Sequence, residues 1–505
     1  MRFKVVVLFL ETINPTCHNY ITQPLKLMPP AIVLFLYTCF VVFLLKKEKY
    51  FASSVSGFSW IPTMWMLYFA GKPLGRWFNP KGAIVESPED RFFLLSLMLL
   101  GLIMISKRGL EWGGALRRNG WFTLLLAYML LSCLWSDEIF SSFKQWVRVF
   151  GTTIMSLVIL TERDPREALQ SIFFRTVIIL IPLSVILIKY FPDLGVEYRS
   201  WNGEKFWVGA ALQKNGLGRL CLFSAVFISW RLINRWTAEK EAPAWKYESY
   251  IGLLLLFFIG WMLMGSGSNL PMTAIGVLAL CVSILMSLLL INRSLGYPLF
   301  TCIAAFTVLS ALSLTFMSIT GVIPSLGNEA IGRDTTFTGR TYIWAGLRSI
   351  ASDNLILGVG YSGFWAHHHI FPIVGDVNEG HNGYLDVLVE TGIFGIVLLL
   401  IIIVSYARRA NYEKAYDYPW ACLKIVILFM LLIHNFTETS LLRSSAHLWV
   451  VFIYMYIVSP VNVPQNTAVK SRTPKKPESV DLVAKPIISG SVKLYTFRRR
   501  VRGSK

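Results

Sequence analysis

The sequence predicts an all-α polytopic membrane protein with about 12–13 transmembrane helices. Hydrophobic residues make up 54% of the 505-residue chain, charged residues make up only 15%, and the mean hydropathy is +0.55. The apolar residues occur in blocks of about 16–25, the length that a helix needs to cross a hydrocarbon core of about 30 Å. A β-barrel is excluded because its membrane strands would be about ten residues long and would alternate in polarity.

The predicted spans follow one another along the chain with polar breaks between them. The seventh differs from the others because Lys214, Asn215 and Arg219 interrupt an otherwise apolar block. The predicted spans lie near residues 29–45, 53–71, 92–106, 121–136, 145–160, 172–191, 206–232, 250–265, 271–292, 298–320, 385–406, 419–435 and 445–459.

The placement of Lys and Arg orients the predicted bundle. The net charge is +19, and the basic residues lie between spans and in the C-terminal tail. Basic loops and tails are typical of the cytoplasmic side, so this charge predicts contact with anionic lipid and not with nucleic acid. The basic clusters that fall on this side are 46–49, 107–118, 235–240 and 407–414.

One long loop, residues 322–384, falls on the opposite, non-cytoplasmic side. Loops of this length are usually functional or disordered. The aromatic and aliphatic residues of this loop favour a small packed domain with short helices. Residues 341–350 predict an amphipathic helix, because Ile343, Leu347 and Ile350 recur at helical spacing.

The remaining predicted organisation is simple. Residues 1–28 form an N-terminal segment without a cleavable signal peptide, because its apolar stretch is short and no small-residue cleavage site follows. Its side of the membrane stays open, as does Met28 as an alternative start. The first ten spans occupy 29–321 and the last three occupy 385–460. A basic, disordered cytoplasmic tail follows at 461–505.

Charged residues at the membrane edge are costly and usually functional. Guanidinium groups bind phosphate oxygens bidentately, and a neutral imidazole can accept a hydroxyl proton at about pH 7. Several arginines with one histidine therefore predict an anionic ligand. A pyrophosphate with an acceptor hydroxyl is one substrate pair that needs both. The candidate residues, all at non-cytoplasmic ends of the topology, are Arg199, Lys214, Asn215, Arg219, Arg333, Arg340, His381, Asn382 and Glu390.

Each candidate also has a structural interpretation. A loop arginine can simply be solvated, and Lys214 can extend to the membrane interface. Asp386 and Glu390 lie four residues apart, share a helical face, and can form hydrogen bonds inside the protein. The histidines at 367–369 show no recognised ligand spacing, so no metal site is predicted. None of the seven cysteines forms a CxxC pair, which is typical of small core residues.

Two stretches carry a resemblance to a known family. GRTYIWAGLRSIASDNLILGVGYSGFW at 339–365 and EGHNGYLDVLVETGIFG at 379–395 resemble the signature region of bacterial O-antigen ligases and Wzy-type polysaccharide polymerases. The ligase pattern is a histidine with Asn, Ser or Gln after it, nine further residues, and G-x-x-G. Here His381 opens that pattern, and Gly392 and Gly395 close it.

Two details favour the polymerases over the ligases. The ligases often have a threonine after the second glycine, whereas this chain has Ile396. The arrangement W-x-G-x-x-x-Q-K-N-x-L-G at 207–218 resembles the ExoQ-like exopolysaccharide branch. The motif resemblance covers about residues 195–400, and the span layout resembles the family over the whole chain.

The resemblance implies a metal-independent, inverting glycosyltransferase with a GT-C-like membrane fold and no cofactor. Its donor is a glycan on undecaprenyl pyrophosphate at the periplasmic face of the bacterial inner membrane. By position, Arg340 matches the pyrophosphate-contacting arginine of the family's loop, and Arg199 matches its second arginine. His381 matches the histidine that activates the acceptor hydroxyl. The small residues Gly392 and Gly395 are expected to allow close helix approach below it.

The predicted function is polymerisation of lipid-linked repeat units into exopolysaccharide. Lys214, Asn215 and Asn382 are expected to orient sugar or phosphate oxygens, and Asp386 and Glu390 to hold His381 or a backbone group in place. The expected partners are the lipid-linked donor and acceptor, membrane lipid, and proteins of chain-length control and export. A surface-glycan ligase and a transporter of lipid-linked sugars remain alternatives. The transporter is disfavoured because the chain shows no paired half-repeats.

Overall fold

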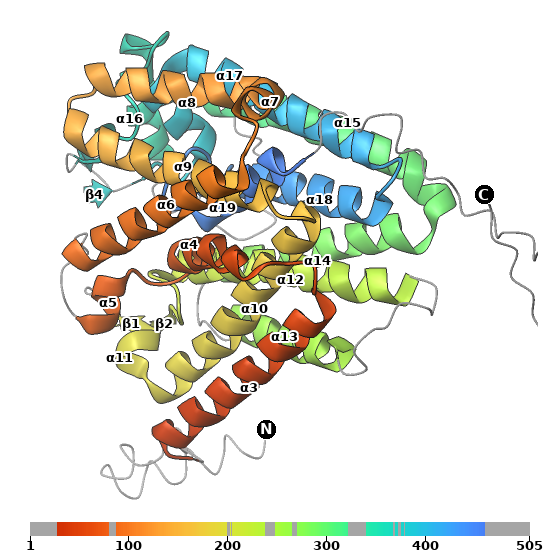
Figure 1. Ribbon diagram of the computed structural model, residues 1–505. Helices are drawn as coiled ribbons and strands as arrows, with labels where there is room; N and C mark the ends of the chain where they lie inside the picture. The colour runs from red at the N-terminus through yellow and green to blue at the C-terminus, as the bar shows by residue number, and fades with distance from the viewer. Residues whose placement is uncertain are drawn as a thin grey trace, which may run out of the picture. The chain divides into compact units, whose positions relative to one another are not determined.

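The computed structural model describes residues 28–79, 87–198, 203, 205–237, 248–264, 270–321, 340–366, 369–371, 375–377 and 379–459 (Figure 1). Helices dominate these ranges, and the strands within them form two short antiparallel hairpins. Every predicted span overlaps one helix, in the predicted order. The predicted all-α polytopic membrane protein is thus confirmed.

The first helices run from the N-terminal side to the hairpin β1–β2. They are α3 (Pro30–Phe51), α4 (Trp60–Ala70), α5 (Leu74–Phe78), α6 (Pro88–Arg108), α7 (Trp112–Arg118), α8 (Gly120–Ser132), α9 (Ile139–Leu160), α10 (Pro165–Tyr190) and α11 (Pro192–Gly195), followed by β1 (Val196–Tyr198) and β2 (Lys205–Trp207).

The second set of elements ends at the last described helix. They are α12 (Lys214–Thr237), α13 (Glu248–Met264), α14 (Leu270–Ile291), α15 (Arg293–Thr320), α16 (Arg340–Asp353), β3 (His369–Phe371), β4 (Gly375–Val377), α17 (Gly383–Glu413), α18 (Tyr418–His434) and α19 (His447–Ile457). The amphipathic helix predicted at 341–350 is confirmed as α16, which buries Ile343 and Leu347.

The helices differ in whether they are long enough to cross a membrane. Within the described ranges, five are long and apolar enough, or six if α6 and α7, bent by 114°, count as one span. This number is smaller than the predicted 12–13, because several other helices are short. All residues of the short helix α19 are buried by protein, and protein can also satisfy the backbone groups at helix ends that lipid would leave unpaired.

The seventh predicted span begins later than expected. The sequence predicts a helix from residue 206, whereas β2 occupies Lys205–Trp207 and α12 starts at Lys214. Lys72 holds the intervening turn, donating from Nζ to the carbonyl of Gly209 at 2.7 Å and also to that of Ala211. This anchored turn sets where the polar N-terminus of α12 lies.

Helix α17 is broken at Gly392, which has φ +63° and ψ −169°. A neighbouring loop fills the break: Val359 N–H donates to Val389 O at 2.9 Å, and Ile393 N–H donates to Leu355 O at 2.8 Å. A Cβ at Gly392 would lie 2.2 Å from the carbonyl oxygen of Ile356. The expectation of close helix approach was therefore wrong for this glycine, which accommodates an inserted loop.

Candidate active site

A single carboxylate, that of Glu438 in the loop between α18 and α19, joins three of the predicted site residues. Arg340 Nη2 donates to Glu438 Oε1 at 2.9 Å, and Asn215 Nδ2 donates to Oε2 at 3.0 Å. His381 Nδ1 lies 3.4 Å from the same Oε2. Arg340 also donates to the carbonyl of Thr437. The starts of α12, α16 and α17 therefore meet at one buried acid.

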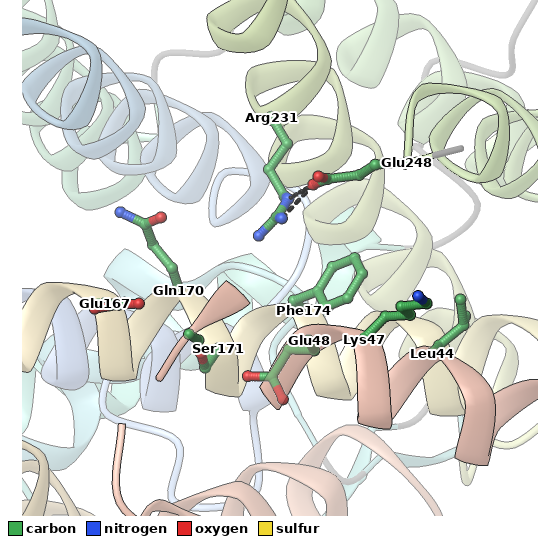
Figure 2. Close-up of a pocket in the computed structure, with 10 residues that line it drawn as sticks. Leu44, Lys47, Glu48, Glu167, Gln170, Ser171, Phe174, Arg231 and Glu248 are labelled. Atoms are coloured by element: carbon green, nitrogen blue, oxygen red, sulfur yellow. Dashed lines mark hydrogen bonds and ion pairs between the residues drawn. The ribbon is translucent and has the colours of Figure 1, made fainter. Parts of the chain in front are cut away.

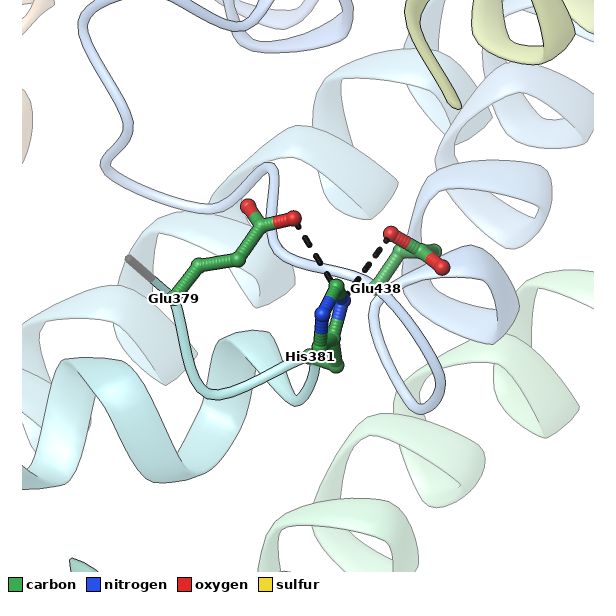
Figure 3. Close-up of side chains that lie close together, drawn as sticks. All are labelled: Glu379, His381 and Glu438. Carbon is green, nitrogen blue, oxygen red and sulfur yellow. Dashed lines mark hydrogen bonds and ion pairs between the residues drawn. The ribbon is translucent and has the colours of Figure 1, made fainter. Parts of the chain in front are cut away.

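His381 presents one ring nitrogen to two carboxylates. Its Nδ1 atom lies 3.4 Å from Glu379 Oε1 and 3.4 Å from Glu438 Oε2, as the dashed lines in Figure 3 show. Carboxylate oxygens accept hydrogen bonds, so this environment favours the tautomer with the proton on Nδ1. The lone pair of Nε2 is then the one available to take a proton from a substrate.

The backbone of His381 is itself unusual. Its φ of +49° lies in the left-handed region, which non-glycine residues adopt only when surrounding contacts impose it. The flanking residues supply those contacts. Gly380 N–H lies 3.2 Å from both carboxylate oxygens of Asp386, and Gly383 N–H donates to the carbonyl of Asn435 at 2.8 Å. The strain is thus held at the one residue that carries the predicted base.

The glycines beside His381 are required by space. A Cβ at Gly380 would lie 2.3 Å from Asp386 Oδ1, and a Cβ at Gly383 would lie 2.2 Å from Asn435 Oδ1. A Cβ at either position would therefore displace the side chain of Asp386 or of Asn435, each of which accepts hydrogen bonds from the backbone. The G-H-N-G sequence therefore packs the His381 turn directly against α17 and the loop after α18.

Burial and the neighbouring charges shift the pKa of His381 in opposite directions. Burial alone lowers the pKa of His381, but the hydrogen bond with Glu438 and the charges of Glu379 and Glu438 raise the pKa more, to a net value above the ordinary one. Burial raises the pKa of Glu438, but His381 and Arg340 hold it well below the usual range for a carboxyl group. Glu438 is therefore ionised at neutral pH, and its charge favours the protonated form of His381.

Asn382 is engaged inside the protein. Its Oδ1 accepts from Leu385 N–H at 3.2 Å and caps α17, and its Nδ2 donates to Ser318 Oγ of α15 at 3.1 Å. The side chain is 1% exposed. These contacts give Asn382 a role in fixing the start of α17, while its predicted contact with substrate stays a prediction.

Below the His381 turn, Arg443 lies between two buried acids. Its Nη2 is 3.4 Å from Asp386 Oδ2, and its Nη1 is 3.4 Å from Glu390 Oε1. Thr439 also donates to Asp386 at 2.6 Å. Asp386 and Glu390 therefore face the protein interior, and Asp386 holds a backbone group of the His381 turn, as predicted.

The remaining predicted residues are placed as follows. Arg219 donates to the carbonyl of Thr439 at 3.4 Å, which ties α12 to the loop of Glu438. Lys214 Nζ lies 5.3 Å from the centre of the Phe206 ring, at the start of α12. Arg199 and Arg333 lie outside the described residues. So do the side chains of the histidines at 367–369.

Glu438 and Arg443 are site residues that were not among those predicted from the sequence. Both lie in the loop at 436–444, and the two predicted spans between this loop and the loop 322–384 place both loops on the same, non-cytoplasmic side. The signal that selected His381, a charge at the end of an apolar span, applies equally to these two residues.

Glu379, His381 and Glu438 are also a group that could hold a metal ion, since their ligand atoms lie within 4.8 Å of one another. The guanidinium of Arg340 is 2.9 Å from Glu438, however, and brings a positive charge to the same carboxylate. A second cation there would meet repulsion. The arrangement suits a histidine oriented by carboxylates better than it suits a metal.

A polar cavity lies elsewhere in the protein, where α3, α10, α12 and α13 meet, and Figure 2 shows it. Its volume is about 180 Å³. Arg231 and Arg235 both pair with Glu248 there, at 3.2 Å in the case of Arg235. The cavity lies near the C-terminal end of α12, whereas Asn215 lies at the N-terminal end. It is therefore separate from the Glu438 cluster.

Comparisons with known proteins agree with the predicted resemblance. Residues 253–400 match the O-antigen ligase family, and Arg340, His381 and Glu390 lie within this region. The chain is 24% identical over 302 residues to the exopolysaccharide production protein ExoQ of Rhizobium meliloti (strain 1021). That alignment covers 56% of this chain and 63% of the relative, which is less than two thirds of the relative's length. Its long apolar helices make this chain a multi-pass membrane protein, and the comparisons show that it is similar to the O-antigen ligases and to an exopolysaccharide production protein.

Proposed function

We propose that this chain is a membrane glycosyltransferase that joins lipid-linked oligosaccharide repeat units into exopolysaccharide. The observation that carries the proposal is the convergence of Arg340, His381 and Asn215 on Glu438. The similarity to an exopolysaccharide production protein supports it. The fold would be GT-C-like, in the bacterial inner membrane, with the site and the loop 322–384 on the periplasmic side.

The donor in this proposal is a glycan on undecaprenyl pyrophosphate, and Arg340 binds its pyrophosphate. A guanidinium has five N–H donors, and Glu438 and Thr437 accept two of them. The others can meet phosphate oxygens and stabilise the charge that develops on the leaving group. Arg199 is proposed as the second arginine, and Lys214, Asn215 and Arg219 as further polar contacts along the start of α12.

His381 supplies the base. The acceptor hydroxyl oxygen forms a bond to the anomeric carbon of the donor while its proton passes to His381 Nε2. The bond from the anomeric carbon to the pyrophosphate oxygen breaks, and its electron pair leaves with the lipid pyrophosphate. Attack on the face opposite the leaving group inverts the anomeric carbon. Glu438 and Glu379 hold the imidazole and stabilise the imidazolium that forms.

Two substitutions test the proposal in cells. His381→Ala and Arg340→Ala are each expected to abolish high-molecular-weight polysaccharide while the protein still inserts into the membrane. Arg163→Ala removes an exposed arginine outside the cluster and serves as the matched control. Polysaccharide of near-wild-type length in both site variants would contradict the proposed roles.

A ligase is the second candidate, because the matched family is described as O-antigen ligase. The chemistry is the same, but the acceptor is a surface glycan instead of another repeat unit. The lipid-linked products of a deletion strain separate the two. Loss of a polymerase leaves single repeat units on the carrier, whereas loss of a ligase leaves long lipid-linked polymer.

A transporter of lipid-linked sugars is tested with purified protein. Turnover of lipid-linked donor in detergent, without a sealed membrane, would exclude a pure transporter. No turnover in detergent, combined with flipping of donor in vesicles, would instead overturn the enzyme proposal.

A further inference from the structure

An apolar groove of about 440 Å³ runs along one face of α17. Trp121 of α8 borders it, and the other lining residues recur at helical spacing on α17. Those residues are Val397, Leu400, Ile401, Val404, Ser405 and Arg408. The groove is therefore apolar along most of its length and ends at a serine and a guanidinium.

The length of the groove fits one leaflet of a bilayer. Eleven residues separate Val397 from Arg408, which at about 1.5 Å per residue corresponds to about 16 Å along the helix. This is about half of the hydrocarbon core, which is about 30 Å thick. Arg408 lies at the basic end of the bundle, the side that the distribution of Lys and Arg predicts to be cytoplasmic.

Arg408 and its neighbour Arg409 have opposite environments. Arg409 is buried and donates to Asn119 Oδ1 at 2.9 Å, to Tyr456 O at 2.8 Å and to Arg118 O at 2.6 Å. Arg408 is exposed, and no ion-pair partner for it occurs among the described residues. One arginine thus holds α17 to the start of α8, while the next presents its charge at the mouth of the groove.

Helix α7 adds a membrane-surface element at the same end. It bends by 114° from α6 and leads directly into α8. It exposes Trp112 and Leu116, which are 49% and 52% accessible. Its last residues, Arg117 and Arg118, are also exposed. An amphipathic helix with exposed tryptophan and arginine is typical of the lipid–water interface.

We propose that this groove binds one anionic phospholipid of the cytoplasmic leaflet. An acyl chain lies along Val397–Val404, and the phosphate binds Arg408, with Arg117 and Arg118 adding positive potential nearby. Basic pockets at the cytoplasmic ends of spanning helices favour such headgroups. The site lies at the end of α17 opposite His381, so it is independent of the proposed glycosyl transfer.

The test compares two lipids with the same acyl chains and different headgroups. Full-length protein in detergent is titrated with phosphatidylglycerol or phosphatidylcholine, and bound lipid is counted by native mass spectrometry. We expect wild type to bind phosphatidylglycerol about fivefold more tightly. Arg408→Gln is expected to lose this preference, and Arg163→Gln, an exposed arginine outside the groove, is expected to keep it. Val404→Trp, which fills the groove, is expected to weaken the binding of both lipids.

Three outcomes would overturn the proposal. Equal binding of the two lipids by wild type would show that headgroup charge is not recognised. An unchanged preference in Arg408→Gln would remove the proposed phosphate contact. Displacement of phosphatidylglycerol by an equal concentration of undecaprenyl phosphate would assign the groove to an isoprenoid chain. Thermal unfolding of each variant in detergent confirms that the variants remain folded.

Discussion

Arg340 Nη2 donates a hydrogen bond at 2.9 Å to Oε1 of Glu438, a residue 98 positions later in the chain. The other oxygen of that carboxylate faces His381 Nδ1 at 3.4 Å. The proposed phosphate-binding arginine and the proposed base therefore share one acid. A change at Glu438 should act on both partners, which makes it the most informative position in the site.

Glu438→Gln should move the pH dependence of turnover. The pKa of His381 lies above its ordinary value of about 6.5, partly because of the hydrogen bond and charge of Glu438. The proposed base must be neutral, so activity should fall as the pH drops through this raised pKa. Removing the Glu438 charge lowers the pKa of His381, and the acid limb of kcat/KM should shift to lower pH.

The measurement is the pH profile of kcat/KM with lipid-linked donor in detergent. We also expect a fall in kcat of about 10–100-fold at neutral pH, because the imidazole loses its orienting carboxylate. Glu111→Gln removes an exposed carboxylate at the start of α7 and is the matched control. A lower rate with an unshifted acid limb would contradict the assigned influence of Glu438 on His381.

Replacing His381 should separate its chemistry from its backbone strain. His381→Gly and His381→Ala both remove the imidazole, and both should lose about 10²–10⁴-fold in turnover. Glycine accepts φ +49° freely, whereas alanine pays about 1–2 kcal/mol there. The glycine variant should therefore unfold at a higher temperature than the alanine variant. Residual activity that follows thermal stability would point to a structural role instead.

Arg443→Met should destabilise the protein through Asp386 and Glu390. The two acids are 2% and 3% exposed, and Arg443 lies 3.4 Å from each. Removing the cation leaves two buried carboxylates uncompensated, at a cost of about 3–5 kcal/mol. Thermal unfolding in detergent measures the loss. Adding Asp386→Asn and Glu390→Gln should recover part of it, and no recovery would show that the packing of Arg443 matters more than its charge.

Gly392→Ala should disrupt the break in α17. An alanine would have φ +63° and a Cβ 2.2 Å from Ile356 O. A backbone with φ +63° and ψ −169° is essentially restricted to glycine and costs another residue about 1–3 kcal/mol, and the overpacking costs about 1–3 kcal/mol. The thermal unfolding temperature of Gly392→Ala in detergent should therefore be clearly lower than that of the wild type. Gly260→Ala is the control, because no atom lies within 4 Å of the added Cβ. Equal behaviour of the two variants would show that the inserted loop is not essential.

The sequence by itself determined the class of the protein and the residues at the ends of its spans. Apolar blocks and helical spacing are local signals, so each predicted span overlaps a helix and α16 appears where expected. The motif around His381 and Arg340 was sufficient for the family resemblance. These features could be predicted because each depends on residues that are near one another in the chain.

Only the tertiary structure decided which residues meet. Glu438 lies 57 positions from His381 and 223 from Asn215, and no local pattern links those separations. The same holds for Arg443, which lies in the same loop as Glu438 and neutralises two acids on α17. Asn382 is the opposite case: its position beside the predicted base suggested a contact with substrate, but its side chain caps α17. The position of a charged residue is known from the sequence. The residue that it contacts depends on how distant segments pack, and this contact determines the role of the charged residue.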